Sequence, residues 1–294
     1  MLQERGDRAF NIFINVVLVL FGLIILYPLW YVVICSFSDP GAIITGEVFL
    51  WPVGFTLEGY DAMMESTELW TGYANTILYT GVCSLLGLAL QLTCAYGLSR
   101  KQMPGRGVIN MFFMITMYFS GGMIPFYMLM ADFDWINTRW VMMIPGAFSM
   151  WNVIVARSYF MGSIPDSLFD AARIDGCGYF RFFLKVVLPL STAMIAIIAL
   201  YNMQAHWNSY LTGQIYLQNN ELFTVQQVIV NIQNATKSIS QSQGVASEII
   251  IATERKAQLL RYTSIIVAAI PMIAMYPFVQ KYIVKGVMVG AVKG

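Results

Sequence analysis

Long apolar segments limit the fold of this chain of 294 residues more than any other feature. Six of them lie between the charged residues, at positions 9–38, 69–99, 107–131, 140–156, 186–211 and 262–280. Each is near or above the roughly 17–25 residues that a helix needs to cross a hydrocarbon layer about 30 Å thick. They lack the short alternation of β-barrel strands, so helices remain as the structure that pairs every backbone group in lipid. The sequence predicts an all-α, polytopic membrane protein in which residues 1–294 form one domain with six transmembrane helices.

The distribution of charge predicts the orientation in the membrane. Only 11% of the residues are charged, and 17 of them are Lys or Arg. If the amino terminus is cytoplasmic, twelve of these 17 fall on the cytoplasmic side, whereas eleven of the 16 acidic residues fall outside. Basic residues concentrate on the cytoplasmic loops of membrane proteins. We therefore expect both termini, the loop 164–185 and the tail 281–294 in the cytoplasm, and the loop 212–261 outside.

The apolar segments contain no carboxylate. This argues against a carrier driven by protons or sodium, because such carriers bind the cation on an acid near the midplane. The chain also has no G-x-x-x-x-G-K-[ST] loop for nucleotide phosphates, and its single His and scattered Cys do not form a zinc hydrolase site or a Ser-His-Asp triad. We expect neither enzyme activity nor a cofactor on this chain. Energy for active transport would have to come from another subunit.

The predicted cytoplasmic loop contains a helix signal, the segment IPDSLFDAARIDG. Pro165 suits a first helical turn, Asp166 favours the positive end of the helix dipole, and Gly176 suits a left-handed cap. These features predict a helix of about eleven residues. Ala171 and Ala172 keep its surface flat. Such a helix fits a docking site for a partner protein, and an ordinary solvated loop helix is the alternative.

One spacing pattern runs from this loop into the next apolar segment. Asp170, Ala171 and Ala172 are followed after three residues by Gly176 and, after nine more, by Val-Val-Leu-Pro at 186–189. The pattern resembles the EAA motif, E-A-A-x(3)-G-x(9)-I-x-L-P, of the permease subunits of bacterial ABC importers, with Asp for Glu and Val for Ile. The resemblance implies that the loop helix seats in a groove of a separate ATPase subunit. It implies ATPase-coupling roles for Asp170, Ala171, Ala172, Asp175, Gly176, Leu188 and Pro189.

Other segments resemble the smaller permease of maltose-type importers. Residues 276–294 are similar to its carboxyl end, whose tail approaches the ATPase dimer, and residues 119–130 and 151–165 look like their counterparts in a subgroup for complex oligosaccharides. The resemblance spans nearly the whole chain and implies a protein of the bacterial plasma membrane. The partners it implies are a second, different permease subunit, two ATPase subunits that bind ATP and Mg²⁺, and an extracytoplasmic sugar-binding protein. It implies no nucleic-acid partner.

The predicted outer loop 212–261 is rich in Gln, Asn, Ser and Thr and has a helix-like core, TVQQVIVNIQ. Loops of this length are uncommon unless they have a function. In maltose-type importers the matching loop of the smaller permease contacts the binding protein, which is the role that the resemblance implies here. The alternative is a cap over the helix bundle.

Polar and aromatic residues gather where the fifth apolar segment ends, in YNMQAHWNSY. Tyr201 and Asn208 share one face of a helix, and Asn202 and His206 share an adjacent one. Amides and aromatic rings suit a neutral sugar, which takes hydrogen bonds from planar groups and stacks on rings. These four residues are our candidates for the substrate path, with an interfacial aromatic belt and inter-helix hydrogen bonds as the alternative. His206 alone fits a structural role better than ligand binding.

Two functions are compatible with these features. The first is the transmembrane subunit of an ATP-driven importer that moves a sugar or oligosaccharide inward by alternating access, coupled through the EAA-like loop. The second is a membrane anchor or receptor-like protein whose cytoplasmic helix only docks a partner. Ligand-stimulated ATP hydrolysis by the chain together with its partners would separate the two. Neither the sugar nor its length follows from the sequence.

Overall fold

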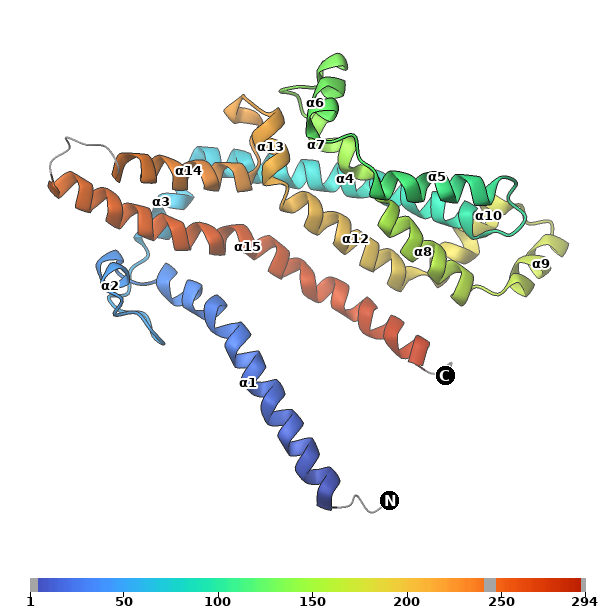
Figure 1. The fold of residues 1–294 in the computed structure, drawn as a ribbon, viewed down its shortest axis with the longest axis horizontal. Helices are drawn as coiled ribbons and strands as arrows, with labels where there is room; N and C mark the ends of the chain where they lie inside the picture. Colours follow the sequence, from blue (N-terminus) through green and yellow to red (C-terminus); the bar gives the residue numbers. More distant parts are fainter. Residues whose placement is uncertain (1–4, 241–246, 292–294) are drawn as a thin grey trace. The chain divides into compact units, whose positions relative to one another are not determined.

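The structure is a computed structural model that describes residues 5–240 and 247–291. Every regular element in these residues is helical, which confirms the predicted all-α class. Figure 1 labels the main helices. They divide between two compact units. One unit contains the described residues up to Leu69 together with Ile229–Ile270, and the other contains Trp70–Val228 and the chain from Pro271 onward.

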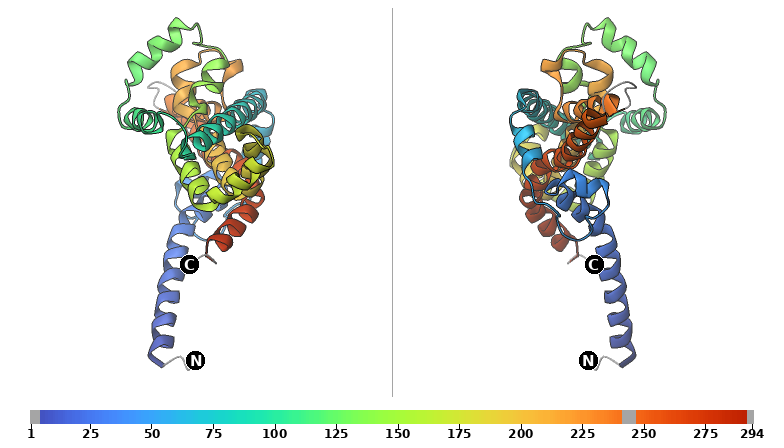
Figure 2. Two further views of the ribbon diagram at one scale, coloured as in Figure 1. Left: turned by 90° about the vertical axis from the view of Figure 1, so that its right-hand side faces the viewer. Right: turned by 90° about the vertical axis from the view of Figure 1, so that its left-hand side faces the viewer.

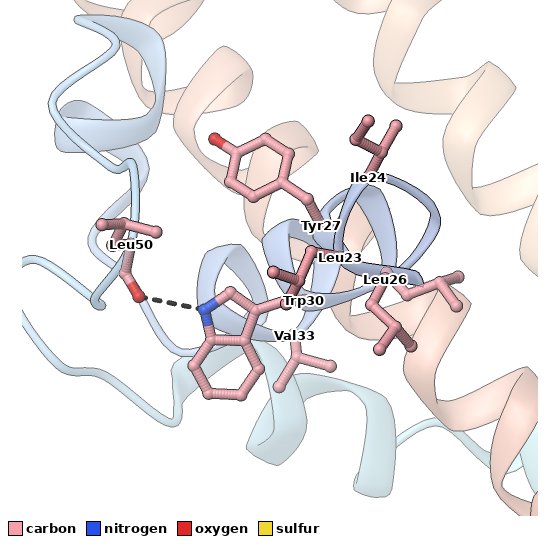
Figure 3. A pocket seen from close by; sticks show the side chains of 8 residues that line it. Leu23, Ile24, Leu26, Tyr27, Trp30, Val33 and Leu50 are labelled. Atoms are coloured by element: carbon pink, nitrogen blue, oxygen red, sulfur yellow. Dashed lines mark hydrogen bonds between the residues drawn. The ribbon is translucent and has the colours of Figure 1, made fainter. Parts of the chain in front are cut away.

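The first unit begins with α1 (Arg5–Ser36). Two short helices follow, α2 (Pro40–Ile44) and α3 (Glu58–Met64). The chain between these short helices folds back along α1, where Trp30 Nε1 donates a hydrogen bond to the Leu50 carbonyl at 3.0 Å (Figure 3). Parts of two later helices complete the unit, α14 (Val225–Ser240) and α15 (Ser247–Ala291).

The second unit contains most of α4 (Thr67–Ser99) and the helices that follow it. In chain order these are α5 (Arg106–Tyr118), α6 (Met123–Asp132), α7 (Trp140–Met143), α8 (Met150–Ser163), α9 (Asp166–Ile174), α10 (Tyr179–Phe182), α11 (Leu188–Leu190), α12 (Thr192–Trp207) and α13 (Tyr210–Tyr216). A π-helical turn (Phe183–Val187) joins α10 to α11. The main apolar core of this unit joins α4, α8, α9 and α12, and it includes Leu98, Phe160, Phe169, Phe182 and Ile198.

Three of the six predicted spans lie in continuous helices. Phe10–Ser36 in α1, Thr67–Ser99 in α4 and Arg255–Pro277 in α15 are each long enough and apolar enough to cross a membrane. They confirm the predicted segments 9–38, 69–99 and 262–280 as helices of spanning length.

Two predicted spans, 107–131 and 186–211, are bent rather than continuous. α5 and α6 meet at 110°, and Tyr179–Leu190 meets Thr192–Trp207 at 85°. Figure 2 shows α5 and α6 as two green helices that run in different directions. Gly122 makes the first break with a φ of 86°, which residues with a side chain rarely adopt. Pro189 lies just before the second break and has no N–H for the helix.

The remaining predicted span, 140–156, is interrupted as well. α7 ends at Met143, a 3-10 turn covers Pro145–Ala147, and α8 starts at Met150. A continuous helix over this segment is therefore wrong, because Pro145 lacks a backbone N–H and Gly146 follows it directly. If each bent pair counts once, the described residues hold five candidate spans, so the total of six stays a prediction.

The predicted outer loop 212–261 is largely helical where the structure describes it. α13 ends within it, α14 contains most of the expected helical core TVQQVIVNIQ, and α15 begins at Ser247. Residues 241–246 of this loop lie outside the described residues, as do residues 292–294 of the predicted tail 281–294.

Candidate coupling site and substrate path

α9 is the helix predicted in the cytoplasmic loop, and it has nine residues rather than about eleven. Asp166 lies in its first turn and Arg173 in its last, so both charges complement the helix dipole. The chain reverses at Gly176, whose φ is 74°. Gly176 N–H donates to Arg173 O at 3.0 Å and Cys177 N–H donates to Ala172 O at 2.8 Å, which are the paired bonds of a Schellman cap. The predicted left-handed cap is confirmed.

One side of α9 is attached to the core and the other side is open. Phe169 is only 2% exposed, and its ring centroid lies 4.9 Å from that of Tyr179 and 5.2 Å from that of Phe182. Ala172 also packs against this core. Ile174, at the end of the helix, is 88% exposed. The exposed motif residues are Asp170, Ala171, Asp175 and Gly176.

The other two motif residues, Leu188 and Pro189, lie on α11. Leu188 packs against the same core as Phe169, whereas Pro189 is exposed. Because a proline has no N–H and its ring crowds the preceding turn, Pro189 accounts for the widened π turn at Phe183–Val187. Leu188 and Pro189 thus determine the path of the chain between α10 and α12. The exposed surface that a partner could contact is that of α9.

Two residues that hold α9 in place were missed by the sequence analysis. Phe169 holds the helix against the core. Its spacing of three residues from Ala172 would have predicted that both side chains lie on the buried face of the helix. Arg100, directly after α4, places its guanidinium carbon 5.6 Å from the Phe169 ring centroid. Nothing in the sequence around Arg100 distinguishes it from an ordinary cytoplasmic basic residue.

An exposed ion pair links the first turn of α9 to Lys101. Lys101 Nζ lies 3.0 Å from Asp166 Oδ2, and both side chains are mostly exposed. The hydrogen bond from Lys101, followed by the charge of the same ammonium group, lowers the pKa of the Asp166 carboxyl. Exposed pairs of this kind contribute little to stability, so Phe169 provides most of the attachment.

Asn202, one of the substrate-path candidates, is 4% exposed and lies inside a cluster of three buried amides. Asn152 Nδ2 donates to Asn202 Oδ1 at 3.0 Å and to Gln91 Oε1 at 3.2 Å, and Asn202 Nδ2 donates to Gln91 Oε1 at 3.3 Å. Gln91 Nε2 donates to the Ala147 carbonyl at 2.8 Å, next to the break between α7 and α8. These are the inter-helix hydrogen bonds named above as the alternative role for Asn202.

The other three path candidates have different surroundings. Tyr201 is 47% exposed. Asn208 follows α12, and its Nδ2 donates to the Gln204 carbonyl at 3.0 Å. His206 lies against Gly146 and lines a cavity of about 420 Å³ between α6, α7, α12 and α13. The cavity is also lined by Met123, Phe126, Ser209, Thr212 and Tyr216, a mixture of apolar, aromatic and hydroxyl groups.

The first unit has a cavity of its own, of about 480 Å³ and lined by charged side chains. Asp39 caps α2 by accepting hydrogen bonds from Gly41 N–H at 2.8 Å and Ala42 N–H at 3.3 Å. The same carboxylate pairs with Arg255 at 3.3 Å.

Known relatives match this chain over almost its whole length, although no family model matches it. It is 31% identical to the polygalacturonan/rhamnogalacturonan transport system permease protein YtcP of Bacillus subtilis (strain 168), over 98% of this chain and 99% of the relative. It is 26% identical to the arabinooligosaccharides transport system permease protein AraQ of Halalkalibacterium halodurans, over 93% of each chain.

A solved structure matches the fold as well. It is the crystal structure of a bacterial ABC transporter involved in the import of the acidic polysaccharide alginate. One of its chains superposes with a TM-score of 0.83 and 32% identity, covering 96% of this chain and 99% of that one. Full-length similarity in sequence and in fold thus agrees with the EAA-like loop, and the chain belongs to the permease subunits of bacterial carbohydrate ABC importers.

Proposed function

We propose that this permease moves an oligosaccharide inward across the bacterial plasma membrane by alternating access, driven by ATP that separate ATPase subunits hydrolyse with Mg²⁺. The observation that carries the proposal is the open face of α9. There Asp170 and Ala171 lie on α9, which Phe169 attaches to the core, and Asp175 and Gly176 follow in its cap, so that the EAA-like spacing is kept. A helix that is fixed on one side and open on the other can transmit a push from a partner. We assign ATP hydrolysis to the separate ATPase subunits, because this sequence has no G-x-x-x-x-G-K-[ST] loop to bind nucleotide phosphates.

The proposed topology has six spans and two cytoplasmic termini. The distribution of basic residues supports it, and so does the full-length match to permeases. It places the loop 164–185 and the tail 281–294 inside and the loop 212–261 outside. In cells from which the native cysteines have been removed, an impermeant thiol reagent should label Gln218→Cys and leave Ser167→Cys unlabelled. Labelling of both positions in intact cells would reject this topology.

The proposed assembly contains a second, different permease, two ATPase subunits and an extracytoplasmic sugar-binding protein, and it involves no nucleic acid. Its proposed substrate is a sugar or oligosaccharide, because the relatives are named for carbohydrates: polygalacturonan/rhamnogalacturonan, arabinooligosaccharides and the polysaccharide alginate. A thermal-shift screen of the cognate binding protein against neutral and uronate oligosaccharides would identify the sugar. A binding protein stabilised only by amino acids or peptides would reject the carbohydrate assignment.

The proposed substrate path follows α12. His206 offers a hydrogen-bonding ring to the cavity it lines, and Tyr201 and Asn208 are exposed on the same helix or at its end. Asn202 has a supporting role, because its amide is hydrogen-bonded to Gln91 and Asn152 and so holds α12 against α4 and α8. This support role replaces direct contact with the sugar as the function that we propose for Asn202.

The decisive experiment is reconstitution of the complete complex in proteoliposomes. A transport subunit predicts that the sugar-loaded binding protein stimulates ATP hydrolysis and that sugar accumulates inside. A membrane anchor or receptor-like protein would bind its partner without either response, and that result would overturn the proposal.

A further inference from the structure

We propose that Arg100 is a positioning residue that makes α9 and the end of α4 move as one body during transport. The inference rests on the ATPase-coupling role proposed above for α9. The inference adds the route by which a movement of α9 reaches the membrane spans. The movement passes through the buried side chain of Arg100 into α4.

Arg100 follows α4 directly and is only 7% exposed despite its charge. Its guanidinium carbon lies 4.9 Å from the ring centroid of Tyr96, 5.6 Å from that of Phe169 and 5.7 Å from that of Phe182. These rings belong to α4, α9 and α10. A cation over aromatic faces is attracted more strongly when water is excluded. One guanidinium therefore contacts all three elements at once.

Aromatic rings make the close contacts of Arg100, and the carboxylate of Asp166 adds only a weaker attraction, because the charge of Arg100 is the last of the causes that lower the pKa of Asp166. The two ion pairs found among residues 5–240 and 247–291, Lys101–Asp166 and Arg255–Asp39, do not include it. Its Nε is buried and has no hydrogen-bond partner among the described residues. A flat guanidinium can stack on several rings, whereas the compact ammonium of lysine cannot. The geometry thus requires arginine in particular.

The ring cluster also leaves α9 little freedom to tilt away from α4. The Tyr96 hydroxyl donates to the Tyr179 carbonyl at 3.1 Å, and the Tyr96 ring stacks on Phe183 at 4.9 Å. Separating α9 from α4 would pull Phe169 out of this cluster and expose the charge of Arg100 without its rings. A push on the open face of α9 should therefore displace the end of α4 together with it.

A crosslink tests whether the two elements keep their distance through the cycle. In a complex with the native cysteines at 35, 83, 94 and 177 replaced by serine, Lys101→Cys and Asp166→Cys place thiols at the exposed ion pair. A short, reducible bifunctional thiol reagent then joins α9 to position 101, the second residue after α4. We expect sugar uptake to equal that of the same complex before crosslinking. The single variant Lys101→Cys, treated in the same way, controls for modification alone.

Substitution of the arginine gives the second test. Arg100→Lys keeps the charge but loses the stacking plane, and we expect the sugar imported per ATP hydrolysed to fall roughly 5- to 30-fold while the complex still assembles. Lys101→Gln, one residue away, should leave this ratio near that of the parent. Measuring the ratio separates a coupling defect from a loss of folded protein, which would lower uptake and hydrolysis together.

The outcomes distinguish this inference from the proposed function. A parent complex without sugar-stimulated ATP hydrolysis would remove the coupling role itself. If the parent couples transport to ATP hydrolysis, but the complex with Lys101→Cys and Asp166→Cys loses uptake on crosslinking and regains it on reduction, then α9 moves relative to α4. That result overturns this inference and leaves the proposed function standing. The inference is also overturned if Arg100→Lys imports as much sugar per ATP hydrolysed as the parent does. If the Arg100→Lys complex fails to assemble, the crosslinking result decides.

Discussion

Two of the sites at which the second unit buries polar side chains differ in how the polar groups are satisfied. Near α9, the guanidinium of Arg100 lies among aromatic rings. Between α4, α8 and α12, the amides of Gln91, Asn152 and Asn202 are satisfied by one another. Rings accept a cation over a broad range of angles, whereas each amide needs a partner at a defined distance and direction.

The consequence is a difference in what each region can tolerate. The surface next to the ring cluster is open, so motif residues there can change without disturbing the core. In the amide cluster, removal of one member leaves buried groups unpaired, which costs about 1–3 kcal/mol. We infer that the first region transmits force from a partner into α4 and that the second holds three spans together. The predictions below test this division, starting with the largest effect.

Gly176→Asp should abolish uptake while leaving the amount of protein in the membrane unchanged. A side chain at this position meets no described atom within 4 Å in this chain, but the φ of 74° strains any residue other than glycine, so the loss of uptake has to exceed the effect of that strain. Gly105→Asp is a matched control, because Gly105 has a similar φ of 71° and equally open surroundings. Uptake and membrane abundance are measured for both variants. Equal losses of uptake, or normal transport by Gly176→Asp, would contradict a docking role.

Asn202→Leu should lower uptake roughly 5- to 150-fold, the range that corresponds to about 1–3 kcal/mol for a buried group left unpaired. The thermal unfolding midpoint should fall with it, because Gln91 and Asn152 lose a partner. Asn152→Leu provides the comparison, since it disturbs the same cluster from α8. If Asn152→Leu transports normally while Asn202→Leu does not, then Asn202 contacts the sugar and the two regions are not divided as we propose.

His206→Phe should have a smaller effect, with uptake reduced roughly 2- to 13-fold, because it removes one hydrogen-bonding group worth about 0.5–1.5 kcal/mol from the cavity wall. The aromatic ring stays against Gly146, but its hydrogen bond with the Gly146 backbone is lost, so the thermal unfolding midpoint should fall slightly. The affinity for the binding protein, measured in the same membranes, should stay at the parent value. Parental uptake would indicate a purely structural histidine.

Asp166→Asn should have the smallest effect, because it removes only an exposed ion pair at the start of α9. In the parent protein, the pair stabilises the folded state above the ordinary carboxyl pKa of 3.8. This contribution disappears as pH falls through the lowered pKa of folded Asp166. Thermal unfolding of parent and variant should therefore differ slightly at neutral pH and converge in acid. A large loss of uptake in the variant would show that the ring cluster is not the main attachment of α9.

The coupling loop could be predicted well from the sequence because its signals are local. The acid at the start of α9 and the glycine at its end determine a helix and a cap within a dozen residues, and Gly176 adopts the expected conformation. The breaks at Gly122 and Pro145 also carry local signals, glycine pairs and prolines. Such residues are common in membrane helices, so they do not by themselves predict where a span bends.

The surroundings of the path candidates could not be predicted, because they depend on contacts between distant segments. Asn202 meets Gln91 across 111 positions and Asn152 across 50. Helical spacing placed Asn202 and His206 on one face, but it could not show that one is enclosed by amides and the other lines a cavity. Arg100 is a similar case, since its rings come from three separate elements.

The most direct test of coupling is to identify what the open face of α9 touches in the assembled importer. A photo-crosslinking amino acid at Ala171, which is exposed on α9, should form an adduct with the ATPase subunit. The same amino acid at Gln218, in the predicted outer loop, should not. We expect the Ala171 adduct to form in membranes that contain the complete complex and to be weakened by Gly176→Asp. An ATPase adduct from Gln218, or none from Ala171 in an actively transporting complex, would contradict the coupling role of α9.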